Sequence, residues 1–278
     1  MTKLKNSILV VAMIASFNAY AAENKVVTGL KNPESVVVAD GRVYVSEIGE
    51  FGKDGDGVIS VIGADGKAKV FASGMDDPKG LAYSKGALYV ADNKRILKVG
   101  KDGKWSVFVA AEAFPVKPLF LNDLEFGKDG SLFVSDSGDL KGKGGAVYRV
   151  AADGKVTTVV NGDDPRVLAP NGLLADGDDH LLMVDFVSGA LYRITLKTGK
   201  MDYLIEGFGG GDGLVRDKRG VVWISDWKNG RLFTYKKDGT QEWVKAQFQS
   251  AADIGLAADG RTILVPDMKA GTLTWFKN

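Results

Sequence analysis

The segment LNDLEFGKDGSLFVSD (121–136) joins two short apolar runs by a glycine-containing turn and ends on an aspartate. Apolar segments on either side of such a turn predict an antiparallel β-hairpin. Five other segments repeat the pattern: PESVVVADGRVYVSE (33–47), PKGLAYSKGALYVAD (78–92), PNGLLADGDDHLLMVD (170–185), GDGLVRDKRGVVWISD (211–226) and ADIGLAADGRTILVPD (252–267). A spacing of about 45 residues between them is typical of a repeat protein.

Two further apolar segments follow the hairpin in most repeats. The third strand is expected at segments such as AVYRV (146–150) and ALYRI (190–194), and the fourth at segments such as KVFAS (69–73) and VTTVV (156–160). Four strands in each of six repeats predict an all-β fold, a six-bladed β-propeller of four-stranded blades.

The last repeat contains only three strands, because the sequence ends soon after TLTWF (272–276). The missing strand is expected at the other end of the chain, where KVVTG (25–29) resembles KVFASG (69–74). We therefore predict that the N-terminal strand completes the sixth blade, closes the ring and covers an otherwise exposed sheet edge. No Pro- or Ser-rich linker interrupts the repeats, so residues 22–278 are expected to form a single domain.

The first residues have the pattern of a secretory signal peptide. Lys3 and Lys5 precede the apolar run ILVVAMIASF (8–17), which is too short to span a bilayer, and small residues follow around Ala21. We expect residues 1–21 to be removed and the product to be periplasmic or secreted. After cleavage we expect no association with a membrane.

The composition excludes several classes of function. The 36 Lys and Arg residues are matched by 35 Asp and Glu, so there is no basic field for nucleic acid. Without cysteine, thiolate metal sites and thiol nucleophiles are impossible. His180 is the only histidine and falls in a predicted turn far from the long loops, so a His pair is excluded and a surface position is expected.

Six polar positions are expected to form a ring at one end of the propeller. The first strand of every repeat begins on the face that carries the long connections, such as 48–57 and 137–145, and loops of this kind commonly carry function. The aligned residues are Glu34, Lys79, Asn122, Asn171, Asp212 and Asp253. Carboxylate and amide oxygens are the ligands that Ca²⁺ prefers, and a ring charge of −2 matches one divalent cation. The alternative is that these side chains only tie neighbouring blades together.

Four motifs in four repeats resemble the senescence marker protein/gluconolactonase/luciferin-regenerating-enzyme family. They are PES (33–35), LND (121–123), PNGL (170–173) and GDGL (211–214). The resemblance implies a six-bladed propeller whose central divalent cation, commonly Ca²⁺, is held by Glu34, Asn122, Asn171 and Asp212. It also implies hydrolysis of lactones or phosphorus esters. Asp212 would be the base or nucleophile, Asn122 would act partly through a water molecule or on the substrate, and Asp123 and Asp253 are weaker candidates for the base.

The sequence departs from the family pattern at the pocket. Phe120 stands where sugar-lactonase relatives often carry an arginine. Phe51, Phe114, Phe186 and Trp227 also fall on the long-loop face, so a partly apolar pocket is expected, although each ring could instead pack between blades. We assign Lys79, Asp123 and Asp253 to the same pocket, with a possible ion pair between Lys79 and Asp253.

Two functions from different classes are consistent with these residues. The first is an exported, Ca²⁺-dependent hydrolase of a small lactone or related ester. The second is a non-catalytic propeller that binds a small ligand or a protein partner and keeps the ion as a structural element, because propellers host both kinds of function. The sequence gives no indication of the oligomeric state.

Overall fold

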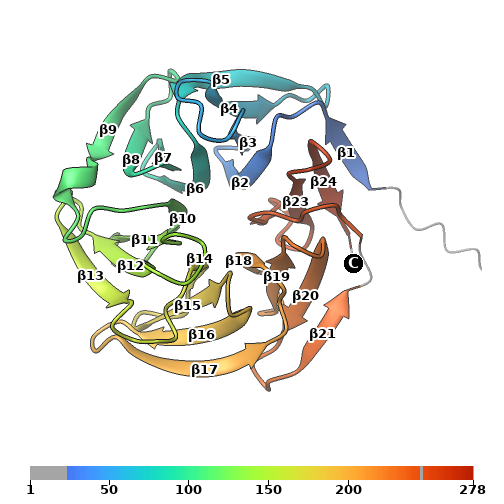
Figure 1. The fold of residues 1–278 in the computed structure, drawn as a ribbon. Coiled ribbons are helices and arrows are strands. Elements are labelled where there is room, and N and C mark those ends of the chain that lie inside the picture. Colours follow the sequence, from blue (N-terminus) through green and yellow to red (C-terminus); the bar gives the residue numbers. More distant parts are fainter. Residues whose placement is uncertain (1–23, 245–246, 278) are drawn as a thin grey trace, which may run out of the picture.

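The computed structural model describes residues 24–244 and 247–277, which form six four-stranded antiparallel sheets in a ring (Figure 1). The predicted signal peptide, residues 1–21, lies outside the described residues. The described part of the chain has no helix of the length and apolar character needed to cross a membrane. The predicted six-bladed propeller is confirmed.

Each blade runs from an inner strand at the centre of the ring to an outer strand at its edge (Figure 1). In that order the strands are β2 (Pro33–Ala39), β3 (Arg42–Glu47), β4 (Gly57–Ile62), β5 (Ala68–Met75); β6 (Pro78–Ser84), β7 (Ala87–Asp92), β8 (Arg95–Val99), β9 (Trp105–Val109); β10 (Leu121–Phe126), β11 (Leu132–Asp136), β12 (Ala146–Val150), β13 (Val156–Asn161); β14 (Pro170–Ala175), β15 (His180–Asp185), β16 (Ala190–Thr195), β17 (Lys200–Glu206); β18 (Gly211–Arg216), β19 (Val222–Asp226), β20 (Arg231–Tyr235), β21 (Gln241–Val244); and β22 (Gly255–Leu256), β23 (Ile263–Asp267), β24 (Thr272–Phe276), β1 (Lys25–Thr28). One short 3₁₀ helix, η1 (Ala111–Ala113), lies between β9 and β10.

The ring closes as predicted, because the N-terminal strand β1 pairs antiparallel with β24. Val27 faces Leu273 across this pair, and its side chain is 2% exposed in a core cluster shared with Leu30 and Leu264. The first strand of the described chain therefore belongs to the same sheet as the last one, and an apolar contact holds it there.

Five buried aspartates end the second strands and fix the connections between blades. The carboxylate of Asp185, for example, accepts hydrogen bonds from the backbone N–H groups of Leu168 and Ala169 before its blade, and from Val187 and Ser188 in the following turn. The equivalent residues are Asp92, Asp136, Asp226 and Asp267. Each of these aspartates therefore ties its hairpin to the preceding inter-blade segment.

We predict that the closure of the ring contributes measurably to stability. Val27→Ala should lower the free energy of unfolding by about 2 kcal/mol, because it removes buried methyl groups and leaves a cavity. Val26→Ala, one residue earlier in the same strand, is the matched control, since Val26 is 50% exposed and should change stability by less than about 0.5 kcal/mol. Urea denaturation of both variants measures the difference. Equal free energies of unfolding would contradict a stabilising contact between β1 and β24.

Candidate functional site

A β-bulge at the start of each inner strand positions the predicted ring residues. In the fourth blade Pro170 faces Asp185 and Leu173 faces Met183, so two residues of β14 oppose one residue of β15. The same shift occurs in the other four blades that have a full inner strand. A bulge of this kind bends a strand and re-aims a side chain. The first bulge residue is Glu34, Lys79, Asn122, Asn171 or Asp212, and all five line one pocket.

The second bulge position brings neighbouring inner strands close together. A Cβ atom added to Gly172 would lie 2.0 Å from the carbonyl oxygen of Asp212 in the next blade. Gly213, the equivalent residue one blade later, faces the backbone of Ile254 at 2.3 Å in the same test. Glycine is therefore required at these two positions, because any side chain would push the ring of inner strands apart.

The strand register corrects the predicted ring in the sixth blade. Ala251 faces Asp267 and Gly255 faces Leu264, so the position equivalent to Glu34 is Ala252, not Asp253. The turn of this hairpin contains one residue more than the turns of the third to fifth blades, which shifts an alignment based on segment length. Ala252 is fully buried beside apolar neighbours, so the sixth ring position offers no ligand.

Asp123 and Asp253 lie at the second bulge position and do not line the pocket. The Asp123 carboxylate accepts hydrogen bonds from the backbone N–H groups of Leu124 at 2.6 Å and Leu173 at 2.7 Å. The Asp253 carboxylate accepts a hydrogen bond from the Ser35 hydroxyl. Both carboxylates therefore form hydrogen bonds between neighbouring inner strands, which argues against the predicted contact with a substrate.

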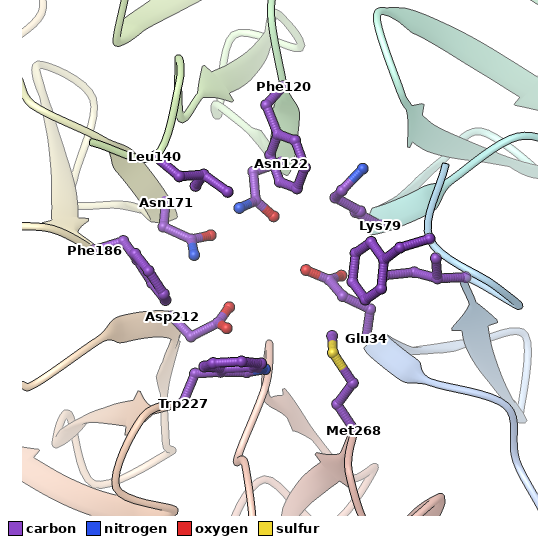
Figure 2. Close-up of a pocket in the computed structure, with 12 residues that line it drawn as sticks. Glu34, Lys79, Phe120, Asn122, Leu140, Asn171, Phe186, Asp212, Trp227 and Met268 are labelled. Carbon is purple, nitrogen blue, oxygen red and sulfur yellow. The ribbon is translucent and has the colours of Figure 1, made fainter. Parts of the chain in front are cut away.

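The pocket is a cavity of about 190 Å³ with polar residues at its centre and apolar residues around them (Figure 2). Of the predicted aromatic residues, Phe51, Phe120, Phe186 and Trp227 line it. Phe114 does not: it is buried in a core cluster, where its ring packs against Tyr148. Three apolar lining residues were not predicted: Ile48, Leu140 and Met268. A signal for two of them exists in the sequence, because Ile48 and Met268 directly follow a strand-ending acid, as Phe186 and Trp227 do.

The two carboxylates of the ring are buried and close enough to disfavour each other's charge. Glu34 and Asp212 are each 4% exposed. Burial raises the pKa of Glu34 well above its usual range, and the negative charges of Asp212 and Asp253 raise it further. Burial and the charge of Asp253 likewise raise the pKa of Asp212 well above its usual range, and a hydrogen bond from Asn171 opposes the shift.

Three buried oxygens of the ring have no hydrogen-bond partner in the described chain: Glu34 Oε2, Asn122 Oδ1 and Asp212 Oδ1. The amide of Asn122 is held in this orientation because its Nδ2 donates to the Ser137 hydroxyl at 3.0 Å, which itself donates to the Pro170 carbonyl at 2.7 Å. Figure 2 shows these groups pointing toward one centre from different blades. Buried polar atoms without partners are costly, so the arrangement fits an oxygen-preferring cation.

The donor set also shows what such a cation would require. The described residues contain no group of three or more His, Cys, Asp and Glu side chains placed to hold a metal ion. A cation between Glu34 and Asp212 would therefore depend on the amide oxygens of Asn122 and Asn171 as well. These are hard ligands, suited to Ca²⁺ or Mg²⁺ rather than to a softer transition metal.

Lys79 is the only cationic side chain that lines the described pocket. Its Nζ donates to the Asp77 carbonyl oxygen at 3.1 Å and lies 4.1 Å from the centroid of the Phe120 ring. Burial lowers the pKa of Lys79, and the negative charges of Asp77 and Glu34 oppose this shift. Within the described residues no ion pair joins it to Asp253, so that part of the prediction is corrected. His180 begins β15, at the end of that strand remote from Asp185.

Comparison with known proteins gives the chain a family. The model of the SMP-30/Gluconolactonase/LRE-like region matches residues 80–265, a span that contains Asn122, Asn171 and Asp212 and begins after Glu34. No curated protein matches the chain.

Three solved structures share the fold. A putative gluconolactonase is 22% identical over 91% of this chain and 92% of its own, with a TM-score of 0.72. The calcium-binding protein regucalcin from Agrobacterium tumefaciens is 20% identical over 89% and 90%, with a TM-score of 0.72. A gluconolactonase from Xanthomonas campestris is 16% identical over 91% and 89%, with a TM-score of 0.74. The resemblance predicted from the four motifs is confirmed, and the chain belongs to the SMP-30/gluconolactonase/LRE-like family.

Proposed function

We propose that the protein is a hydrolase of a lactone or related ester that depends on a divalent cation, with Ca²⁺ as the ion. The observation that carries this proposal is the convergence, in a pocket with largely apolar walls, of three buried oxygens that have no hydrogen-bond partner among the described residues. Membership of the family and the gluconolactonases among its structural relatives support the same reaction class.

The residues that would hold the ion are Glu34, Asn122, Asn171 and Asp212. When bound, the ion would polarise the carbonyl of the substrate and lower the pKa of a water molecule. Net hydrolysis adds water across the acyl C–O bond: the water oxygen bonds to the acyl carbon, and the released alkoxide oxygen takes up a proton. We assign the acceptance of the proton of the water to Asp212, because its buried carboxylate lines the pocket and has a second oxygen besides Oδ1, which would hold the ion.

The walls of the pocket would contribute by excluding water. Phe120, Phe186 and Trp227 surround the ring residues (Figure 2). Apolar walls strengthen the electrostatic interactions of the carboxylates and favour a substrate with an apolar surface. The Asn122 amide would stay fixed during the reaction, because its nitrogen is held by Ser137.

A second candidate is a binding protein in which the ion is structural. This candidate is favoured by the relative regucalcin, which is described as a calcium-binding protein.

In both cases we propose that residues 1–21 are a signal peptide and that the protein is periplasmic or secreted. A panel of aliphatic and sugar lactones, assayed with and without chelator, distinguishes an enzyme from a binding protein.

The proposed cation should stabilise the fold. At 100 times the Kd, Ca²⁺ should add about 2.7 kcal/mol to the free energy of unfolding, and chelator should remove this gain. Glu34→Gln and Asp212→Asn should lose most of the calcium-dependent shift in melting temperature. Asp253→Asn is the matched control, because it changes a buried carboxylate one position outside the ring, and it should keep the shift. A wild-type melting temperature that ignores both Ca²⁺ and chelator would contradict the cation site.

The base assigned to Asp212 can be tested by kinetics. With a lactone that the wild type hydrolyses, Asp212→Asn should lower kcat/KM by roughly 10²- to 10⁴-fold even at saturating Ca²⁺, since it removes the proton acceptor. Asp123→Asn should have a much smaller effect, because Asp123 hydrogen-bonds to backbone groups below the pocket. Undiminished turnover by Asp212→Asn, measured by titration of the acid released, would remove Asp212 from the mechanism.

A further inference from the structure

The second blade contributes a buried lysine, Lys79, to the ring, whereas Glu34, Asn122, Asn171 and Asp212 contribute oxygen atoms. Lys79 is 1% exposed, the most deeply buried lysine side chain in the described chain, and it lines the pocket together with Glu34 and Asn122. An ammonium group has three N–H donors. One donates to the carbonyl of Asp77 and the group lies against the ring of Phe120, so two of its donors have no hydrogen-bond partner among the described residues.

The carboxylates near Lys79 on its own blade have other partners. Asp92 forms an ion pair with Arg95 at 2.8 Å and accepts the backbone N–H groups of Asp76 and Asp77. The side chain of Asp77 accepts the backbone N–H of Gly52 at 3.1 Å. Lys79 itself forms no ion pair with any residue that the structure describes.

The ring carboxylates cannot balance Lys79 once a divalent cation is present. Glu34 and Asp212 together carry two negative charges, which one such ion matches. The negative charges of Asp77 and Asp92 still act on Lys79, but neither forms an ion pair with it among the described residues. A buried charge without a direct partner costs several kcal/mol. A negative charge on the bound ligand would remove this cost.

Two further lysines lie against the aromatic walls of the pocket. Lys228 Nζ is 4.8 Å from the centroid of the Phe186 ring, and Lys269 Nζ is 4.5 Å from the Trp227 ring. Both lysines are exposed, so their charges face the solvent through which a ligand must arrive. The pocket thus combines apolar walls with positive charge at its edge and one positive charge inside, a pattern that attracts anions.

We propose that Lys79 makes the pocket selective for a largely apolar ligand that carries one carboxylate, and that Lys79 Nζ donates a hydrogen bond to that carboxylate. This inference rests on the proposed function, because it names the substrate class: a lactone or ester with an apolar ring or chain and a single negative charge. A neutral sugar lactone fits less well, since its hydroxyl groups would face Phe120, Phe186 and Trp227 without hydrogen-bond partners.

The test compares two ligands that differ in charge but hardly in shape, 1-naphthoate and 1-naphthamide. Their affinities for the calcium-loaded protein are measured by isothermal titration calorimetry at pH 7. We expect the wild type to prefer naphthoate by at least about tenfold. Lys79→Met keeps the length of the side chain without its charge and should lower the ratio of the two affinities about tenfold, which corresponds to about 1.4 kcal/mol. Lys79→Gln is a second uncharged variant. Lys94→Met, which removes an exposed lysine of the same blade outside the pocket, should leave the ratio unchanged.

The outcomes separate this inference from the proposed function. If no lactone is hydrolysed but the ratio follows the charge at position 79, the hydrolase proposal fails and the selectivity stands. If lactones are hydrolysed but the wild-type ratio is near one, or is unaffected in both folded variants, the selectivity is overturned. Loss of both ligands in both folded variants would also overturn it, because Lys79 would then shape the pocket rather than bind a charge.

Discussion

The site depends on a two-against-one bulge that is repeated at the start of the inner strands. In each of five blades the bulge turns one side chain toward the centre of the ring, and the residue after it packs against the next inner strand. The bulge is fixed from both sides, since the first residue of the inner strand faces a buried acid such as Asp185, which also binds the preceding inter-blade segment. Functional groups from distant parts of the sequence can therefore converge without a flexible loop holding them, and this rigidity suits a preorganised site.

The convergence of the inner strands brings two carboxylates into one buried site, where their negative charges need a counter-charge. Glu34 and Asp212 are buried together, and each raises the free energy of the other's charged form. A cation at the centre would favour both ionised carboxylates and supply partners for the oxygens that the protein leaves unpaired. Lys79 lies beside these carboxylates without an ion pair among the described residues, and a cation that neutralises Glu34 removes one of the negative charges that favour its charged form. Charge balance thus links the proposed ion to the proposed anionic substrate.

Much of this could be predicted from the sequence, because a propeller repeats its signals. Six hairpin patterns gave the number of blades, and the likeness of residues 25–29 to 69–74 gave the closure. The bulge residues Glu34, Asn122, Asn171 and Asp212 were found since each begins an inner strand. Asp253 is not a ring residue because register is set by pairing across a hairpin, and one extra turn residue displaces the residues before the turn when the segment is aligned on its final aspartate. The bond from Asn122 to Ser137 and the unpaired state of Lys79 could not be predicted, since they depend on rotamers and on distances between blades.

The most direct test of the account is a crystal structure of the protein grown with saturating Ca²⁺. We expect one ion at the centre of the ring, with Glu34 Oε2, Asn122 Oδ1 and Asp212 Oδ1 at about 2.3–2.6 Å, the distances of calcium coordination. A ring centre without an ion under these conditions, or an ion held instead by Asp123 and Asp253 below the pocket, would contradict it.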